Sequence, residues 1–371
     1  MNLHEFLPPP GEMARRRGPH DRIVMSSRVR LARNIKDAPF PGWAKKPDRL
    51  RALGIIRPAV EGLPEMTGAF SELMENLPAL DRQILVERHL ISREHAARSA
   101  GSGLVLSRDE SLCVMINEED HLRMQALRPG LQFKQAWAAI DQFDSALEQR
   151  LEYAFSPQLG YLTACPTNVG TGIRVSAMLH LPGLVLAEQI NPVIQSVNKL
   201  GLAVRGLYGE GTEALGNVFQ VSNQMTLGES ETTLVERLDK VVSQLIDHEE
   251  NARALLLEKK PKDVLNHIGR AFGVLANAHR ISSKETMNLL SLMRLGIDLE
   301  MFPGVDRALT DELFILVQPY HLQKQHAEKL SGDERDLLRA DMLRERLKIV
   351  SRPVPRPPGA TSAATEPPTE E

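Results

Sequence analysis

The segment Leu112-Cys113-Val114-Met115-Ile116-Asn117-Glu118-Glu119-Asp120-His121-Leu122-Arg123 joins an alternating apolar pattern to a cluster of charged side chains. The residues at 112, 114 and 116 share one face of a strand, and those at 113, 115 and 117 share the other. If the chain stays extended, Glu119, His121 and Arg123 line one face. A carboxylate beside a guanidinium suits a reaction in which the carboxylate takes a proton and the arginine binds phosphate. The segment alone is also compatible with a cluster of solvated charges at a strand edge.

The segment Cys165-Pro166-Thr167-Asn168-Val169-Gly170-Thr171-Gly172-Ile173-Arg174 repeats this arrangement. From residue 173 onward an apolar face alternates with Arg174, which therefore points away from the core. The apolar face consists of Ile173, Val175, Ala177, Leu179 and Leu181. Gly170 and Gly172 allow the backbone before Arg174 to approach a ligand closely, although such a pair is also typical of an ordinary turn.

Two further segments carry arginines in the same kind of context. In the segment from Ser26 to Asn34, extended geometry places Arg28 and Arg30 on the same side, as a clamp for phosphate requires. Arg205 opens the glycine-rich loop Arg205-Gly206-Leu207-Tyr208-Gly209-Glu210-Gly211. The chain contains neither the glycine-rich Walker loop nor the signatures of ordinary protein kinases.

Together these motifs resemble those of the guanidino (phosphagen) kinases, which transfer a phosphoryl group between ATP and a guanidinium. The resemblance implies that arginines bind the ATP phosphates and that Mg²⁺ is held mainly by phosphate oxygens and water, with no metal-binding residue in the protein. The nucleotide-binding residues that it implies are Ser26, Ser27, Arg28, Val29, Arg30, His89, Arg123, Arg174, Val175, Ser176, Ala177, Met178, Arg205, Gly206, Leu207, Tyr208, Gly209 and Glu210.

The resemblance also implies roles at the substrate. Glu119 becomes the catalytic base, Cys165 the catalytic cysteine beside the substrate guanidinium, and Glu210 a second carboxylate that faces the substrate arginine. Without the resemblance, an isolated cysteine is usually a small buried hydrophobe. Glu210 would then be an ordinary solvated loop charge.

The order of the motifs narrows the resemblance to the bacterial protein-arginine kinases. Small-molecule guanidino kinases carry a helical domain of roughly a hundred residues before the first arginine motif, whereas here Ser26-Ser27-Arg28 comes almost at once. In addition, Gln220 stands where those kinases usually place an aspartate. The resemblance implies phosphorylation of protein arginine in stress response and protein quality control, by a homodimer. An activator protein, a heat-shock repressor and a Clp-type unfoldase are the partners that it implies.

The pattern along the chain predicts an α+β fold. Residues 20–230 mix strands, helical stretches and glycine turns, which indicates an antiparallel sheet flanked by helices. Thr233 and Glu236 have the spacing of a capping box, and the apolar residues 234, 238, 241 and 245 then recur at helical intervals until Pro261. Helical patterns at 264–278, 283–295 and 335–349 predict an all-helical second domain. The expected boundaries are a mobile lead-in at 1–20, a guanidino-kinase catalytic domain at 21–255, a helical dimerisation and regulatory domain at 256–350 and a disordered tail at 351–371.

In the helical domain, Arg335-Asp336-Leu337-Leu338-Arg339-Ala340 resembles the family's allosteric phosphoarginine-sensing motif. Phosphoarginine carries an anionic phosphoryl group and a cationic guanidinium, which Arg335 and Asp336 respectively would pair. Taken without the resemblance, the same residues are typical of a solvated helix face.

Composition favours a soluble enzyme. The 371 residues are 42% hydrophobic and 25% charged, with a net charge of -3, so a nucleic-acid partner is not indicated. Two cysteines, at 113 and 165, fit a reducing cytoplasm. We expect no signal peptide, and the apolar stretch from Met178 to Ala187 is far shorter than the ~20 residues that span a membrane.

Two other functions remain open. One is a kinase for free arginine or another small guanidine, against which the missing amino-terminal domain counts. The other is a non-catalytic module that binds phosphoarginine, against which the intact residues Glu119, Arg123, Cys165, Arg174 and Arg205 count. The sequence does not specify target proteins, the need for an activator, the oligomeric state beyond a dimer or a role for the tail.

Overall fold

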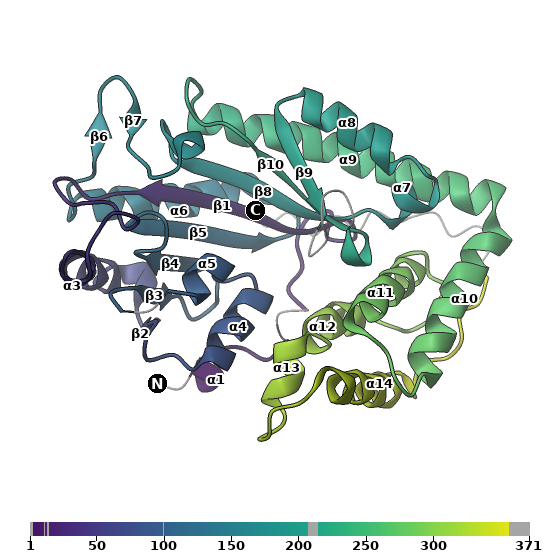
Figure 1. Cartoon of the computed structure of the whole chain (residues 1–371). Coiled ribbons are helices and arrows are strands. Elements are labelled where there is room, and N and C mark those ends of the chain that lie inside the picture. Colours follow the sequence, from purple (N-terminus) through teal and green to yellow (C-terminus); the bar gives the residue numbers. More distant parts are fainter. Residues whose placement is uncertain (1–2, 11, 13–14, 99, 207–213, 356–371) are drawn as a thin grey trace.

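The computed structural model describes residues 3–10, 12, 15–98, 100–206 and 214–355. Within these ranges, an eight-stranded antiparallel sheet with the order β2-β3-β4-β5-β1-β8-β10-β9 forms the centre of the molecule (Figure 1). Its strands are β1 (Val24–Arg33), β2 (Phe70–Leu73), β3 (Gly103–Leu106), β4 (Leu112–Ile116), β5 (Leu122–Pro129), β8 (Ile173–His180), β9 (Leu202–Gly206) and β10 (Val218–Asn223). A separate hairpin consists of β6 (Phe155–Ser156) and β7 (Gly160–Tyr161).

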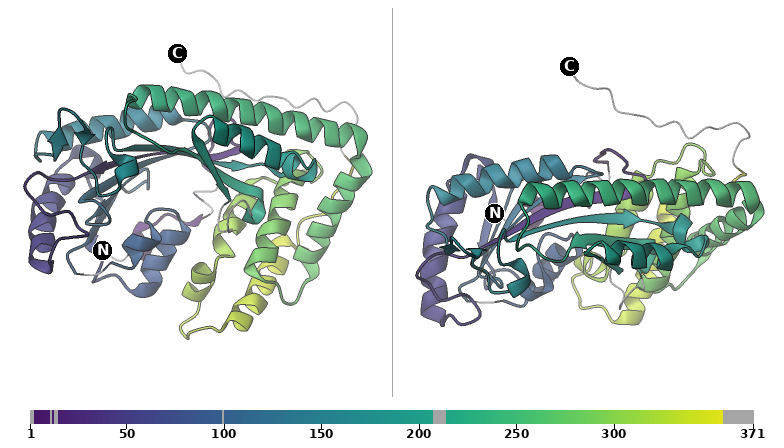
Figure 2. Two further views of the ribbon diagram at one scale, coloured as in Figure 1. Left: turned by 45° about the horizontal axis from the view of Figure 1, so that its top comes forward. Right: turned by 90° about the horizontal axis from the view of Figure 1, so that it is seen from above.

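Helices surround this sheet, which confirms the predicted α+β fold. The helices in the first part of the chain are α1 (Leu3–Phe6), α3 (Lys46–Glu61), α4 (Ala79–Glu87), α5 (Arg93–Ala96), α6 (Phe133–Glu148), α7 (Pro182–Leu186), α8 (Ile190–Lys199) and α9 (Glu231–Lys259). The helical region follows, with α10 (Pro261–Asn277), α11 (Ser283–Asp298), α12 (Ala308–Leu316), α13 (Pro319–Lys324) and α14 (Gly332–Leu347). Figure 2 shows α9 along one face of the sheet and the helical region beyond the other.

The alternation read from the sequence determines which face of the sheet is buried. In β1, Val29 and Leu31 are fully buried in the core under α6 and α9, whereas Arg28 and Arg30 lie on the opposite face. The apolar residues of β8 that alternate with Arg174 lie in the same core. One face of the sheet is therefore an apolar core, and the other carries the arginines.

The long helix α9 begins one turn before its predicted cap. Ser230, and not Thr233, is the N-cap, because the Ser230 hydroxyl accepts a hydrogen bond of 3.2 Å from the Thr233 backbone N–H. Thr233 already lies inside the first turn. The predicted apolar stripe, which includes Leu234 and Leu238, is buried, and the helix ends at Lys259 just before Pro261.

The helical region has its own apolar core, built around Val264, Leu290, Leu313 and Leu343. The three predicted helices correspond to α10, α11 and α14, whereas the short helices α12 and α13 were not predicted. Arg294 of α11 links this region to the sheet region, because its guanidinium donates to the backbone carbonyls of Asp21 and Arg22 at 3.0 and 2.9 Å. The same side chain pairs with Asp311 at 2.7 Å. These contacts fix the helical region against the sheet region.

The two ends of the chain were expected to be mobile. In the described part of the amino-terminal segment, however, Leu3, Phe6 and Leu7 are buried against Phe70 and its neighbours. At the other end, the backbone N–H of Val354 donates to Met301 at 2.9 Å, and residues 356–371 lie outside the described ranges. No helix among the described residues is long and apolar enough to cross a membrane.

Candidate active site

Five arginines from four strands gather on one face of the sheet, with β10 lying between the last two of these strands. Arg28 and Arg30 lie on β1, Arg123 on β5, Arg174 on β8 and Arg205 on β9. The strand register brings them together, because Arg30 lies directly opposite Arg174, and Arg123 lies opposite the residue two positions beyond Arg30. Segments far apart in the sequence therefore meet as the resemblance implied.

The arginines repel one another. Burial lowers the pKa of Arg28 to about 10, and the charges of Arg123 and Arg174 contribute to this shift. Burial and the same two charges, together with that of Arg28, hold the pKa of Arg30 well below its usual value. A bound polyanion would relieve this unfavourable cluster of positive charges.

The segment that carries Glu119 does not stay extended, so that part of the prediction is wrong. Strands β4 and β5 pair antiparallel, with Ile116 opposite Leu122, and Asn117 adopts a φ of 58° at the turn between them. Glu119 therefore lies in a hairpin turn and does not share an extended face with Arg123. Asparagine is one of the residues that tolerates this left-handed conformation best.

Glu118, for which the sequence motifs indicate no role, is the carboxylate that pairs with Arg123. Arg123 Nη1 lies 2.8 Å from both carboxylate oxygens of Glu118, and the Ser92 hydroxyl donates to Glu118 at 2.6 Å. Burial alone would raise the pKa of Glu118, but Arg123 and these hydrogen bonds hold it below its usual value. Glu118 therefore orients Arg123.

Glu119 makes no ion pair with any described residue. Burial raises its pKa, and the neighbouring charges of Asp120 and Glu118 raise it further, whereas Arg123 lowers it. A carboxylate with a raised pKa accepts a proton more readily than an ordinary one. Glu119 is therefore suited to the role of a base.

Asp120 connects the hairpin turn to the loop that carries Cys165. One oxygen of its carboxylate accepts hydrogen bonds from the Ala164 backbone N–H at 2.7 Å and from the Asn34 side chain at 2.6 Å. Because Ala164 precedes Cys165, this bond ties the hairpin turn that carries Glu119 to the loop that carries the thiol. No local sequence pattern indicates this role, because it depends on a contact between residues 44 positions apart.

Cys165 lies beside the arginine cluster. Burial lowers the pKa of Arg174, and Arg205 and Arg123 lower it further. The charges of Cys165 and Glu119 act in the opposite direction and raise the pKa of Arg174. The Cys165 thiol is 3.0 Å from the Thr167 hydroxyl and is half-buried.

Several residues of the implied nucleotide site point elsewhere. The side chains of Val29, Val175 and Ala177 lie in the core on the opposite face of the sheet, so only their backbones face the arginines. The Ser27 hydroxyl donates to the Gly130 carbonyl at 2.7 Å. The side chains of these four residues therefore do not face the arginine cluster, because a strand presents alternate residues to opposite faces. Gly206 is half-buried at the end of β9, and Leu207, Tyr208, Gly209 and Glu210 lie outside the described residues.

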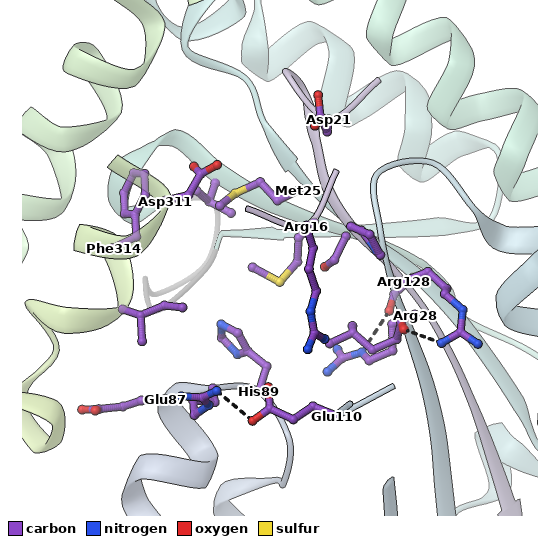
Figure 3. Close-up of a pocket in the computed structure, with 18 of the residues that line it drawn as sticks. Arg16, Asp21, Met25, Arg28, Glu87, His89, Glu110, Arg128, Asp311 and Phe314 are labelled. Carbon is purple, nitrogen blue, oxygen red and sulfur yellow. Dashed lines mark hydrogen bonds and ion pairs between the residues drawn. The ribbon is translucent and has the colours of Figure 1, made fainter. Parts of the chain in front are cut away.

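The remaining implied residues surround a cavity of about 220 Å³ at the other end of the arginine row (Figure 3). Ser26, Arg28, His89, Ser176 and Met178 contribute to its lining. Burial, with a contribution from the charge of Arg28, lowers the pKa of His89 to about 4, so its imidazole is neutral at neutral pH. The surface exposed in the cavity is mostly apolar, as is typical of a small-molecule site, although charged side chains such as Arg16, Glu110 and Asp311 also line it.

The donor set at the arginine cluster bears on where Mg²⁺ would bind. Within the described ranges, no group of three or more His, Cys, Asp and Glu side chains could hold a metal ion. Gln220, which stands in place of an aspartate, accepts a hydrogen bond from Arg28 at 3.1 Å. The residues present therefore fit a metal that is carried by phosphate oxygens and water.

The Arg335–Ala340 motif lies on α14, away from the arginine cluster. Arg335 and Asp336 are half-buried and Leu337 is exposed, whereas Ala340 belongs to the core. Arg339 is buried, and its guanidinium donates to the carbonyls of Val317 and Ile281 at 2.9 Å each and to the carboxylate of Asp336. Arg339 therefore holds α14 against the rest of the helical region.

Two family models match the chain. The model described as ATP:guanido phosphotransferase, C-terminal catalytic domain, matches residues 56–252. The model described as Protein-arginine kinase McsB C-terminal domain matches residues 261–357. The first match covers the sheet region from residue 56 onward and so leaves out β1, and the second covers the helical region.

Individual proteins are similar over nearly the whole chain. A protein-arginine kinase from Halothermothrix orenii is 44% identical over 332 residues, which cover 90% of this chain and 95% of that protein. A protein-arginine kinase from Symbiobacterium thermophilum is 47% identical over 335 residues, which cover 89% of this chain and 94% of that protein. Among solved structures, a lombricine kinase has a TM-score of 0.57 at 25% identity over 67% of this chain and 72% of that chain. A duplicated taurocyamine kinase from Schistosoma mansoni has a TM-score of 0.58 at 25% identity, and the match covers 66% of this chain and 36% of that chain.

Proposed function

The chain belongs to the protein-arginine kinases of the ATP:guanido phosphotransferase family, and we propose that it transfers the γ-phosphoryl group of ATP to arginine side chains of proteins. The observation that carries this proposal is the gathering of five arginines on one face of the sheet, next to the hairpin turn that carries Glu119 and the loop, tied to that turn through Asp120, that carries Cys165. Such an arrangement neutralises phosphate charge on one side and leaves a base for a guanidinium on the other. Phosphoryl transfer depends mainly on these two contributions.

In the proposed reaction, the substrate guanidinium lies between Glu119 and Cys165. A guanidinium nitrogen forms a bond to the γ-phosphorus of ATP, the bond from that phosphorus to the bridging oxygen of ADP breaks, and the lost proton passes to Glu119. Arg123, oriented by Glu118, and Arg174 stabilise the charge on the transferred group. Glu210 remains a candidate for a second substrate carboxylate.

The cavity at the far end of the arginine row is the proposed site of the nucleotide base. Arg28 lines the cavity and also belongs to the cluster, so a nucleotide bound to both would point its γ-phosphate toward Arg174. Neutral His89 and Met178 offer the base a polar edge and an apolar surface. Mg²⁺ would accompany the phosphates and neutralise part of their charge.

The first test asks whether the phosphoryl group goes to arginine in a protein or to free arginine. With labelled ATP, an arginine-rich protein and free arginine in one reaction, we expect the label on the protein. The relatives' full-length match and the helical region support this choice of substrate. Label that appears only in free arginine would instead favour the kinase for small guanidines. A chain that binds phosphoarginine but transfers no label would be the non-catalytic module.

Regulation by phosphoarginine at Arg335 and Asp336 belongs to the same proposal. Asp336→Ala should abolish any stimulation by added phosphoarginine while ATP binding is retained, because the partner of the phosphoarginine guanidinium is lost. The effect should be modest, on the order of 1 to 3 kcal/mol, as for most allosteric links. Activity measured against phosphoarginine concentration checks it.

The matched control is Asp341→Ala, which removes an exposed carboxylate from the same helix. Activation curves of Asp336→Ala that coincide with those of the unaltered protein would show that the motif is an ordinary helix face. We extend the proposal to a homodimer in the cytoplasm that acts in stress response with an activator protein, a heat-shock repressor and a Clp-type unfoldase, as the resemblance implies.

A further inference from the structure

The cavity proposed for the nucleotide base has walls from both regions of the molecule. On one side lie Met25, Met178 and His89 of the sheet region. On the other side lie Met287 of α11, Phe314 and Ile315 of α12, and Gln318. Figure 3 shows Phe314 on the helical side of the cavity, across from His89. A ligand in this cavity would therefore contact both regions at once.

The helical wall is held in place by its own hydrogen bonds. The side-chain amide of Gln318 donates to the Phe314 carbonyl at 2.9 Å and contacts the Met287 sulfur at 3.2 Å. One residue before Gln318, the carbonyl of Val317 accepts a hydrogen bond from buried Arg339 at 2.9 Å. The wall is thus a preorganised surface that requires little rearrangement to receive a ligand.

A second set of bonds ties this wall to the loop that carries His89. The carboxylate of Glu87 accepts hydrogen bonds from the backbone N–H groups of Tyr320 and His321 at 2.9 and 3.0 Å. Glu87 ends α4, two residues before His89, whereas Tyr320 and His321 lie in α13, just beyond Gln318. Hydrogen bonds that cross between the two regions therefore join the two walls next to the cavity.

We propose that Phe314 and Ile315 contact the base of the bound nucleotide, so that the helical region forms part of the ATP site. A purine is flat and mostly apolar, which suits a slot between Met178 and the side chains of Phe314 and Ile315. This inference rests on the proposed function, because it takes the cavity to be the base pocket. It implies that a change in the helical region, including one transmitted through Arg339, would alter affinity for ATP before it altered the chemical step.

The test compares a nucleotide with a ligand that has no base. Binding of ATP and of inorganic tripolyphosphate is measured by calorimetry for the full chain and for Phe314→Ala and Ile315→Ala. We expect ATP to bind about tenfold more weakly to each variant, which is about 1.4 kcal/mol, and tripolyphosphate to bind as it does to the unaltered chain. In steady-state assays, KM for ATP should rise while kcat stays nearly constant.

Phe302→Ala is the matched control. Phe302 is a buried aromatic in the same apolar core and packs on Phe272, but it does not line the cavity. Its loss should lower thermal stability as much as that of Phe314, with ATP affinity unchanged. Because Ile315 is only half-buried, Ile315→Ala provides a folded variant if Phe314→Ala does not fold.

Three results would overturn the inference: ATP affinity unchanged in the folded cavity variants, an equal loss of affinity for ATP and tripolyphosphate, or an equal loss of ATP affinity in Phe302→Ala. Failure of the proposed function has a different signature. The unaltered chain could bind ATP, with the expected loss of affinity in the cavity variants, and yet phosphorylate no protein arginine. That result would support the role of Phe314 and Ile315 in ATP binding and would contradict the proposed function. If the unaltered chain binds no ATP, both the inference and the proposed function are wrong.

Discussion

Glu119→Gln should lower turnover by roughly 10²-fold or more, because removing a general base typically has an effect of this size. The substitution keeps the shape of the side chain but removes both the proton acceptor and the charge that pairs with the substrate guanidinium. ATP affinity should be largely retained, because the arginines that would hold the phosphates are unchanged. Steady-state kinetics with a protein substrate, together with calorimetry for ATP, measure the two effects separately.

The pH profile gives an independent check on Glu119. Its pKa is raised by burial and by Asp120 and Glu118. A base acts only when deprotonated, so kcat/KM should fall as the pH drops through a pKa above that of an ordinary glutamate. This acid limb should disappear from the residual activity of Glu119→Gln.

Three further variants define what the loss at Glu119 means. Glu94→Gln removes an exposed carboxylate whose charge reaches Glu119 and Arg123, and it should leave turnover almost unchanged. Glu118→Gln should weaken the orientation of Arg123, and Cys165→Ser should be milder than Glu119→Gln if the thiol mainly orients the substrate. Near-normal turnover of Glu119→Gln would mean that the proton acceptor lies elsewhere, with Glu210 as the next candidate.

Arg174→Ala should lower kcat/KM by about 10³-fold or more, the effect expected when an arginine that stabilises a transferring phosphoryl group is removed. Arg174 lies directly opposite Arg30 in the sheet, and its side chain interacts electrostatically with Arg205, Arg123, Cys165 and Glu119. Its loss would therefore affect the transferring group itself. Single-turnover measurements with saturating ATP separate this effect from weaker nucleotide binding.

The matched control for Arg174 is Arg51→Ala. Its side chain is 75% exposed on α3, so its removal should change neither activity nor the free energy of unfolding appreciably. The folded state of Arg174→Ala is checked by its thermal transition. A kcat/KM within a few-fold of that of the unaltered protein would show that Arg174 does not contact the transferring group.

The arginine face of the sheet could be predicted from sequence because strands obey a simple rule. Alternation alone places Arg28 and Arg30 on the face of the sheet opposite to that of Val29. It likewise places Arg174 on the face opposite to that of its apolar neighbours in β8. The rule does not reveal where a strand ends. The charges after Ile116 continued the alternating pattern, so the turn at Asn117 was missed, and with it the pairing of Glu118 with Arg123.

Other features depend on contacts that a local pattern does not contain. Asp120 joins the hairpin turn to Ala164, and the cavity brings Phe314 against a sheet whose residues lie far earlier in the chain. The cap of α9 was misplaced because Ser230 and Thr233 are both good capping residues. Short helices such as α12 and α13 give too few turns for a clear periodicity.

The most direct measurement of the central claim is the position and the chemistry of the phosphorylated residue. The unaltered protein, labelled ATP and an arginine-rich protein are incubated, and the product is mapped by site-resolved mass spectrometry before and after treatment with acid. We expect phosphate on arginine, joined through a phosphorus–nitrogen bond that is lost in acid and survives base better than phosphoserine does. The same reaction with Glu119→Gln should yield far less product. Acid-stable phosphate found only on serine, threonine or tyrosine would contradict the account.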